Sequence, residues 1–224
     1  MAPRKPNRPN MPAKPAGRIM FVLGGAASGK SQTALDLARG LAPPQAVPVP
    51  VGRSVQSGQT PRADGGKGVS PRDARKSISP RLAFVATGQA LDEEMAHRIA
   101  RHQSTRSSDW TTVEEPIDPA AWFSRHAQTY QAIVLDCVTL WLSNLQGQGF
   151  PEAAVPGKVE ELLKAMRGSG ARVVIVSNEL GLGLVPLEPA GRAFRDLAGR
   201  ANQQIAAEAD EVYFVVSGLA QRIK

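Results

Sequence analysis

Short apolar runs alternate along the chain with segments whose apolar residues recur at helical spacing. The apolar runs predict strands over residues 18–23, 82–87, 132–136, 172–177 and 211–217, with a shorter strand over 111–113. The helical segments cover residues 30–41, 92–102, a stretch opening at the Asp-Pro pair 118–119, 158–166 and 192–209. Strands that are apolar throughout suit a parallel sheet buried on both faces. The alternation therefore predicts an α/β fold, with a mostly parallel sheet and helices on both faces.

Two segments break this pattern. Residues 1–17 are rich in Pro, Lys and Asn, and residues 43–80 in Pro, Gly, Ser and Arg, without lasting periodicity. We expect a disordered basic tail over 1–17 and a single domain over 18–224 that carries a disordered insert at 43–80. These two segments also supply the net charge of +7, since the remainder is net acidic. Basic residues outside the folded body do not predict nucleic-acid binding as the main function.

The composition excludes several classes of protein. The single cysteine, Cys137, rules out an internal disulfide framework and any zinc site with two thiolates. Because no run of 18 apolar residues occurs, no membrane span is expected. The basic start lacks the apolar core of a secretory signal, so the sequence predicts a cytoplasmic protein.

The clearest motif is GGAASGKS at residues 24–31, which matches the phosphate-binding pattern G-x-x-x-x-G-K-S. In such a loop the backbone N–H groups point at phosphate oxygens, and the positive end of the next helix adds to the attraction. The predicted phosphate contacts are Gly24, Gly25, Ala26, Ala27, Ser28, Gly29, Lys30 and Ser31. Lys30 is expected to reach the terminal phosphates, and the Ser31 hydroxyl to ligate Mg²⁺.

A phosphate loop needs a second acid for its metal ion. Asp136 ends an apolar strand, at the edge of the sheet where ligands bind in α/β folds. Ser31 and Asp136 are therefore the predicted Mg²⁺ ligands. The alternative for Asp136 is a plain cap at a strand end.

Of the three histidines, His102 is singled out because it closes a predicted helix that begins near the second strand, and because a polar run, residues 103–106, follows it. From the residues alone, a partly exposed helical histidine without a catalytic role remains the alternative. Asn178 and Glu179, with glycines just beyond, are consistent with either a site loop or a plain turn.

Several segments together resemble one family, the bifunctional adenosylcobinamide kinase / adenosylcobinamide-phosphate guanylyltransferase of cobalamin biosynthesis. They are residues 24–31, 84–116, 134–145, 177–186 and 194–224. The resemblance implies a P-loop NTPase of RecA-like architecture that uses ATP or GTP with Mg²⁺. It also implies a homotrimer whose sites lie at subunit boundaries.

The resemblance implies two reactions. A nucleoside triphosphate phosphorylates the aminopropanol hydroxyl of adenosylcobinamide, and GMP from GTP then passes through an enzyme histidine to the adenosylcobinamide phosphate. Lys30 and His102 are the implied catalytic residues, because the matching segment reads Arg101-His102 and offers one histidine. The implied nucleotide contacts are Thr87, Gly88, Gln89, Gln103, Ser104, Thr105, Arg106, Glu114 and Asp136.

Other functions remain as alternatives. One is a small-molecule P-loop kinase without guanylyl transfer. A GTP-binding switch would need the string N-K-x-D, which is absent from the sequence. A third is a nucleic-acid-binding P-loop protein that acts through its basic tail.

Overall fold

The computed structural model describes residues 16–43, 81–104 and 106–224. The predicted tail and insert therefore lie outside the described residues, except at Ala16, Gly17 and Pro43. Gly17 is buried, and its N–H donates to the carbonyl of Arg167 at 2.8 Å. Thr105, an expected nucleotide contact, also lies outside the described residues.

A seven-stranded sheet forms the centre of the molecule, in the order β3-β2-β4-β5-β1-β6-β7. The strands are β1 Arg18–Gly24, β2 Leu82–Ala86, β3 Trp110–Glu114, β4 Ala132–Asp136, β5 Arg172–Asn178, β6 Glu211–Val216 and β7 Leu219–Arg222. All neighbouring pairs are parallel except β6 and β7, which form an antiparallel hairpin. The predicted mostly parallel sheet is confirmed.

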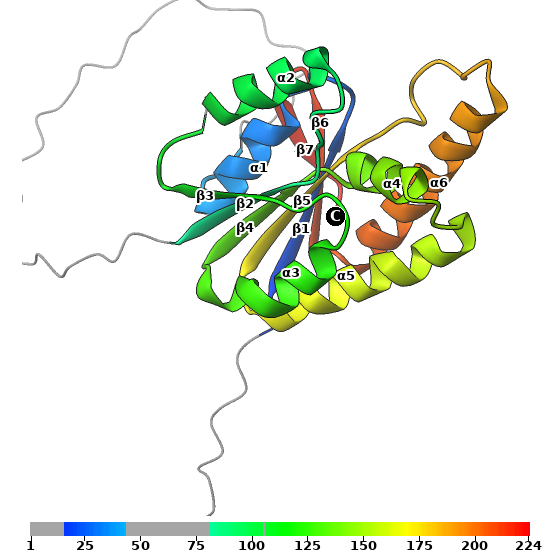
Figure 1. Cartoon of the computed structure of the whole chain (residues 1–224). Helices are drawn as coiled ribbons and strands as arrows, with labels where there is room; N and C mark the ends of the chain where they lie inside the picture. Colours follow the sequence, from blue (N-terminus) through cyan, green and yellow to red (C-terminus); the bar gives the residue numbers. More distant parts are fainter. Residues whose placement is uncertain (1–15, 44–80, 105) are drawn as a thin grey trace, which may run out of the picture.

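Helices cover both faces of this sheet (Figure 1). They are α1 Lys30–Arg39, α2 Glu93–Ser104, α3 Pro119–His126, α4 Val138–Gly147, α5 Val155–Ser169 and α6 Pro189–Glu208, with short 3-10 turns η1 Ala127–Thr129 and η2 Glu152–Ala154. One face packs against α1, and the other packs against α3, α4, α5 and α6. None of the described helices is long and apolar enough to cross a bilayer.

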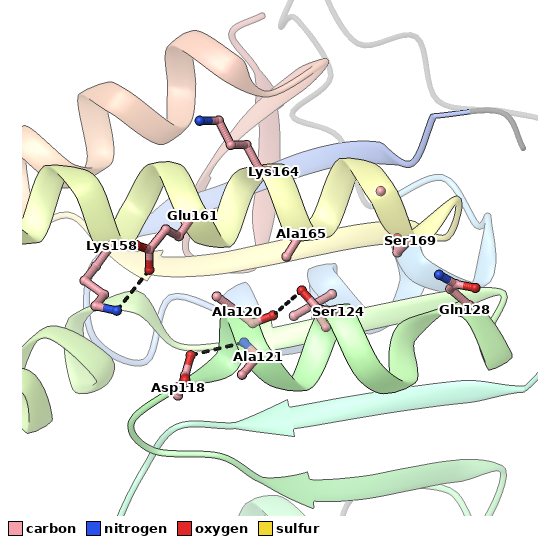
Figure 2. A pocket seen from close by; sticks show the side chains of 12 residues that line it. Asp118, Ala120, Ala121, Ser124, Gln128, Lys158, Glu161, Lys164, Ala165 and Ser169 are labelled. Atoms are coloured by element: carbon pink, nitrogen blue, oxygen red, sulfur yellow. Dashed lines mark hydrogen bonds and ion pairs between the residues drawn. The ribbon is translucent and has the colours of Figure 1, made fainter. Parts of the chain in front are cut away.

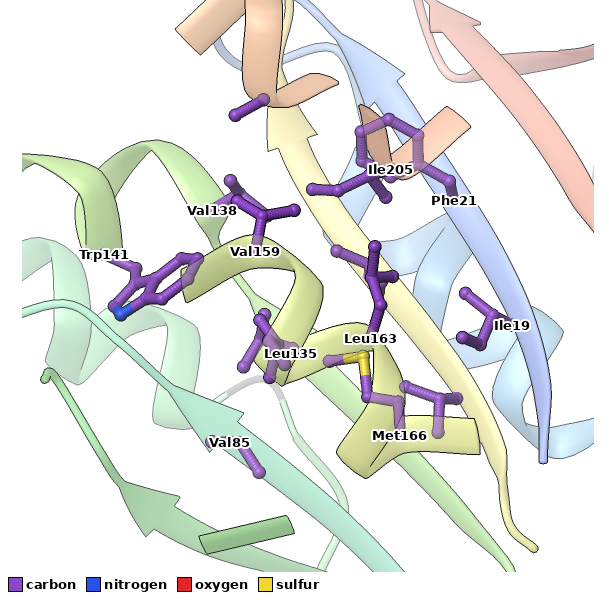
Figure 3. Packing of buried hydrophobic residues seen from close by; sticks show 14 of the residues in the cluster. Ile19, Phe21, Val85, Leu135, Val138, Trp141, Val159, Leu163, Met166 and Ile205 are labelled. Carbon is purple, nitrogen blue, oxygen red and sulfur yellow. The ribbon is translucent and has the colours of Figure 1, made fainter. Parts of the chain in front are cut away.

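Successive residues of a strand supply the two cores in turn. Ile19 and Phe21 of β1 pack into the core beneath α4, α5 and α6, whereas Met20 and Val22 pack against α1. This alternation is the two-residue period of a strand, applied to a sheet that is apolar on both faces. Figure 3 shows the first core, in which Met166 and its neighbours on α5 and α6 cover β1 and β5.

Two elements, α4 and β7, differ from the expectations drawn from the sequence. Helix α4 begins one residue after β4 ends, with Cys137 as its N-cap residue. Strand and helix therefore form one apolar run in the sequence. The spacing of apolar residues changes from that of a strand to that of a helix without a glycine or proline between them to mark a turn. Strand β7 is short and lacks an apolar pattern, and it forms by pairing with β6 across Ser217 and Gly218, both at positive φ.

Candidate active site

The phosphate loop joins β1 to α1 at the carboxyl edge of the sheet. Gly24 has φ +157, and a Cβ there would lie 2.4 Å from the carbonyl oxygen of Val215. Gly29 is the N-cap residue of α1 at φ 96. Both positions need glycine, one for close approach to β6 and the other for its left-handed backbone. The backbone of residues 24–31 thus folds over the N-terminus of α1, the geometry that binds phosphate.

Lys30 is the first residue of α1, and its side chain folds back over the loop. The residue is only 8% exposed, and its Nζ donates to the carbonyl of Gly25 at 2.5 Å. Burial lowers the pKa of the Lys30 amine, and the negative charge of Asp136 opposes part of that change. A charged amine held inside the loop can exchange its carbonyl partner for a phosphate oxygen.

The two predicted metal ligands lie side by side. Strand β5 separates β1 from β4, yet the Ser31 hydroxyl donates to Asp136 Oδ2 at 2.7 Å. Burial raises the pKa of Asp136, while the Ser31 hydrogen bond and the nearby positive charges counteract it. A hydroxyl and a carboxylate are hard oxygen donors of the kind Mg²⁺ takes, with phosphate and water oxygens completing its shell. The donor set therefore fits Mg²⁺ bound together with a phosphate. Within the described ranges, no group of three or more His, Cys, Asp or Glu side chains could hold a metal ion.

Helix α2 carries His102 and makes few contacts with the rest of the domain. None of its residues is buried, and Ile99 is the contact that approaches Gly88 below it. Asp92 caps its start by accepting from the N–H of Met95 at 2.7 Å. His102 is exposed near the end of the helix and lies within electrostatic range of Asp136. The helix thus presents its histidine on the same edge as the metal ligands.

Arg106 connects the end of α2 to the strands beneath it. Its Nε donates to the carbonyl of His102 and its Nη1 to the hydroxyl of Thr112, each at 3.1 Å. The guanidinium also stacks 3.9 Å from the centre of the Phe84 ring. Burial lowers the pKa of Arg106, and the charge of Asp136 opposes that shift. Arg106 is therefore a fixed positive charge between the histidine and the acid.

The other expected nucleotide contacts lie at the same edge of the sheet and differ in how far they are exposed. Gln103 and Ser104 are exposed in the last turn of α2, where the Ser104 hydroxyl donates to the carbonyl of Arg101 at 2.9 Å. Glu114 is exposed at the end of β3, beside Ala86 of β2. Gln89 is partly buried just beyond β2.

Thr87 is fully buried, and its hydroxyl is already engaged by the chain after β4. Its Oγ1 accepts from the N–H of Cys137 at 2.8 Å and donates to the carbonyl of Cys137 at 2.7 Å. The side chain therefore ties the ends of β2 and β4 together beneath the site. The backbone of Thr87 is engaged as well, since its N–H donates to the carbonyl of Asp136 at 3.0 Å and its carbonyl accepts from Asn144 Nδ2 at 2.7 Å.

Thr87→Val is expected to lower the free energy of unfolding by about 1–3 kcal/mol, because valine keeps the shape but leaves the buried N–H of Cys137 without its acceptor. The Cys137 carbonyl keeps a second partner, the N–H of Trp141 at 3.1 Å. Urea denaturation followed by circular dichroism measures this loss. Thr111→Val, at an exposed position on β3, is the control and should change stability by less than about 0.5 kcal/mol. Equal stabilities for the two variants would contradict the role given to the Thr87 hydroxyl.

A polar cluster at the end of β5 contains residues that the sequence analysis did not select. Asn178, paired with Gly24 across the sheet, donates through Nδ2 to the Thr139 hydroxyl at 2.7 Å. Asn202 of α6 donates to the carbonyl of Asn178 at 3.1 Å. Neither Thr139 nor Asn202 stands in a motif, and only the proximity of α4 and α6 to β5 connects them with the site.

Two cavities lie away from the phosphate loop. One of about 640 Å³ opens between α3 and α5, lined by small residues such as Ala121 and Ala165 and by charged residues such as Lys158 (Figure 2). The other, about 740 Å³, lies at the amino edge of the sheet and is lined by Arg18, Arg39 and Arg172, among others. The phosphate loop lines neither cavity, so the two are separate from the site described above.

Known proteins resemble this chain over most of its length. The sequence profile of the family described as "Cobinamide kinase / cobinamide phosphate guanyltransferase" matches residues 62–223. The chain is 39% identical over 166 residues to "Bifunctional adenosylcobalamin biosynthesis protein CobU" of Salmonella typhimurium (strain LT2), which covers 65% of this chain and 87% of that protein. It is 38% identical over 161 residues to "Bifunctional adenosylcobalamin biosynthesis protein CobP" of Pseudomonas aeruginosa (strain PAO1), which covers 68% of this chain and 92% of that protein.

Among solved structures, the KaiC-like protein PH0186 of Pyrococcus horikoshii OT3 aligns with a TM-score of 0.44 and 10% identity, over 89% of this chain and 71% of that one. That likeness is too weak to support an argument. The P-loop NTPase architecture is instead evident from the strand order, with β5 between the strand of the phosphate loop and the strand of the acid. This RecA-like arrangement is the one that the sequence analysis predicted, and it is confirmed.

Proposed function

Because this chain belongs to the cobinamide kinase / cobinamide phosphate guanyltransferase family, we propose that it uses one phosphate loop for two successive transfers to adenosylcobinamide. The chain is an enzyme with both a kinase and a guanylyltransferase activity. Its substrates are ATP or GTP and the corrinoid acceptor. One observation supports a shared site: Lys30, the Ser31–Asp136 pair and the helix of His102 lie at one edge of the sheet.

In the kinase step, the aminopropanol hydroxyl of the acceptor attacks the γ-phosphorus. The bond to the β-phosphate oxygen breaks, the nucleoside diphosphate leaves, and the hydroxyl proton is released. Lys30 and the N–H groups of the loop offset the negative charge that moves onto the phosphates. No covalent intermediate on the enzyme is needed in this step, because positioning and charge stabilisation suffice.

In the guanylyl step, a neutral imidazole nitrogen of His102 attacks the α-phosphorus of GTP and pyrophosphate leaves. The phosphate oxygen of the acceptor then attacks the phosphorus of the histidine-bound GMP, which forms the diphosphate and restores the imidazole. A nucleophile of this kind divides a difficult transfer into two easier ones. Arg106 lies close enough to Asp136 and to the backbone of His102 to bind the α-phosphate during both attacks.

Mass spectrometry of the intact protein after incubation with GTP and Mg²⁺ tests this proposal. We expect a mass increase of one GMP, mapped to the peptide that contains His102, and its loss when the corrinoid phosphate is added. A kinase without guanylyl transfer would phosphorylate adenosylcobinamide but show no adduct. A nucleic-acid-binding protein would do neither.

We also propose that Ser31 and Asp136 hold Mg²⁺ together with the triphosphate. The ion would neutralise phosphate charge and fix the geometry of the leaving group. Asp136 would keep one coordination position filled, and the Ser31 hydroxyl would exchange its hydrogen bond to the carboxylate for the ion. We propose further that the protein is a homotrimer, that it acts in the cytoplasm and that it has no nucleic-acid partner. Light scattering of the purified protein tests the trimer.

Asp136→Asn is expected to lower the rates of both activities by at least about 100-fold at a fixed Mg²⁺ concentration, because an amide binds the ion far more weakly than a carboxylate does. The measurement is the rate of each step against Mg²⁺ concentration. Glu160→Gln, at an exposed site on α5, is the control and should leave both curves unchanged. An unchanged Mg²⁺ dependence in Asp136→Asn would assign Asp136 to the structural role of a strand cap.

A further inference from the structure

The segment between β5 and α6, residues 179–188, exposes a group of large apolar side chains. Leu182 is 76% exposed, Leu184 96%, Val185 65% and Leu187 92%. Isolated exposed leucines are common, but a contiguous apolar patch on a soluble domain marks a site where something binds. We call residues 182–187 the apolar segment.

Hydrogen bonds from α6 fix the path of this backbone. Arg192 donates to the carbonyls of Pro186 and Leu187 at 3.1 and 2.5 Å, and Arg195 donates to the carbonyl of Gly181 at 2.7 Å. These contacts hold main-chain atoms and leave the leucine side chains pointing to solvent. The apolar segment thus has a fixed backbone, and its apolar side chains are exposed to solvent instead of packing onto the core.

The apolar segment continues directly from the phosphate site. The N–H of Glu179 donates to the carbonyl of Gly24 at 3.1 Å, so the connection that leads into the apolar segment begins against the first residue of the phosphate loop. Figure 1 shows it in orange, running from β5 to α6 at the same end of the sheet as α2. The connection from β5 to α6 therefore starts at the phosphate loop and leads into the apolar segment.

The other described surfaces around the phosphate loop expose fewer large apolar side chains. Helix α2 exposes Glu93, Glu94 and Arg101, with Leu91 just before it as a single exposed apolar residue. The turn at Gly218, whose N–H donates to the carbonyl of Ser28 at 2.8 Å, is short and exposes two apolar side chains, Val216 at 55% and Leu219 at 46%. Among these described surfaces, the apolar segment exposes the most large apolar side chains, four against two at the turn.

We propose that the apolar segment binds the corrin macrocycle of the acceptor, an inference that rests on the proposed function and names the acceptor-binding surface of that site. The acceptor hydroxyl, and later its phosphate, must reach the nucleotide phosphates at the carboxyl edge, so the ring lies just beyond that edge. A corrin ring carries methyl groups and a broad hydrocarbon face, with amide groups at its rim. Leucine side chains cover such a face, and the exposed peptide groups between them can bond to the amides.

The test is acceptor binding by the double variant Leu184→Ser/Leu187→Ser. Equilibrium dialysis of adenosylcobinamide against the full-length protein, without nucleotide, measures Kd. We expect Kd to rise at least about tenfold, since two apolar contacts are lost. Formation of the GMP adduct from GTP should keep its wild-type rate, because that half-reaction needs no acceptor. Ile223→Ser is the matched control: Ile223 is 60% exposed, lies just after β7 at the opposite edge of the sheet, and should leave Kd unchanged.

Each other result overturns the inference. Equal Kd values for wild type and double variant would show that the ring binds elsewhere. A smaller assembly in light scattering, with or without weaker binding, would identify a second copy of the chain as the occupant of this surface. If wild-type protein binds no adenosylcobinamide, the proposed function fails as well, which distinguishes that failure from the failure of this surface alone.

Discussion

His102→Ala is expected to lose the GMP adduct and the guanylyl transfer by at least about 1000-fold, while its kinase rate stays within about threefold of wild type. The guanylyl step depends on an imidazole nucleophile, which alanine cannot replace. The kinase step transfers phosphate directly between bound substrates and needs no such group. His102 is exposed on a helix without buried residues, and alanine favours helices, so the variant should fold normally.

The assay compares adenosylcobinamide phosphate formation with covalent labelling by GTP labelled at the α-phosphate. His97→Ala is the matched control, because His97 is exposed on the same helix, five residues earlier and therefore about 140° round its axis. His97→Ala should take up label at the wild-type rate. Label in His102→Ala but not in His97→Ala would make His97 the nucleophile. Label in both variants would place the intermediate elsewhere.

The fold could be predicted where each element carries its own local signal. The runs that became β1, β4 and β5 are apolar throughout and flanked by glycines or polar residues, so their existence and parallel pairing followed from the sequence. Helix α4 could not be separated from β4, because a single residue divides two apolar elements. Strand β7 forms because it pairs with β6 across a turn. Its four residues have no apolar pattern of their own that would predict a strand.

The parts of the site that could be predicted are those whose residues form a recognisable motif with known chemistry. The phosphate loop and Asp136 were identified from their spacing and position, and the structure brings Ser31 and Asp136 into contact although they are 105 residues apart. The bond between Asn178 and Thr139 has no such motif, because it depends on how β5 and α4 lie against each other. The buried role of the Thr87 hydroxyl was hidden for the same reason: its partner, Cys137, follows a different strand. Local sequence shows which residues can do chemistry, and the packing decides which of them are free to do it.

Lys30→Ala is expected to lower both activities by at least about 100-fold, because one amine would serve the phosphates in each step. The wild-type amine is already held over the loop, where burial lowers its pKa and Asp136 partly opposes that shift. Alanine removes the desolvated amine but also takes one positive charge away from the buried Asp136, so the two effects oppose each other and the melting temperature should change little. Loss of activity without loss of stability would therefore assign Lys30 to phosphate chemistry rather than to the fold.

The measurement pairs the two activity assays with thermal unfolding and GTP affinity. Lys164→Ala is the control, since Lys164 is exposed on α5 and its Nζ pairs with Glu160 Oε1 of the same helix at 2.6 Å. That variant should keep both activities at the wild-type rate. A Lys30→Ala protein with normal kinase activity and no guanylyl transfer would contradict the shared loop, because the two steps would then hold their phosphates in different places. If both rates fall together, the two reactions use the same phosphate loop in succession, and the acceptor must return to it for the second transfer.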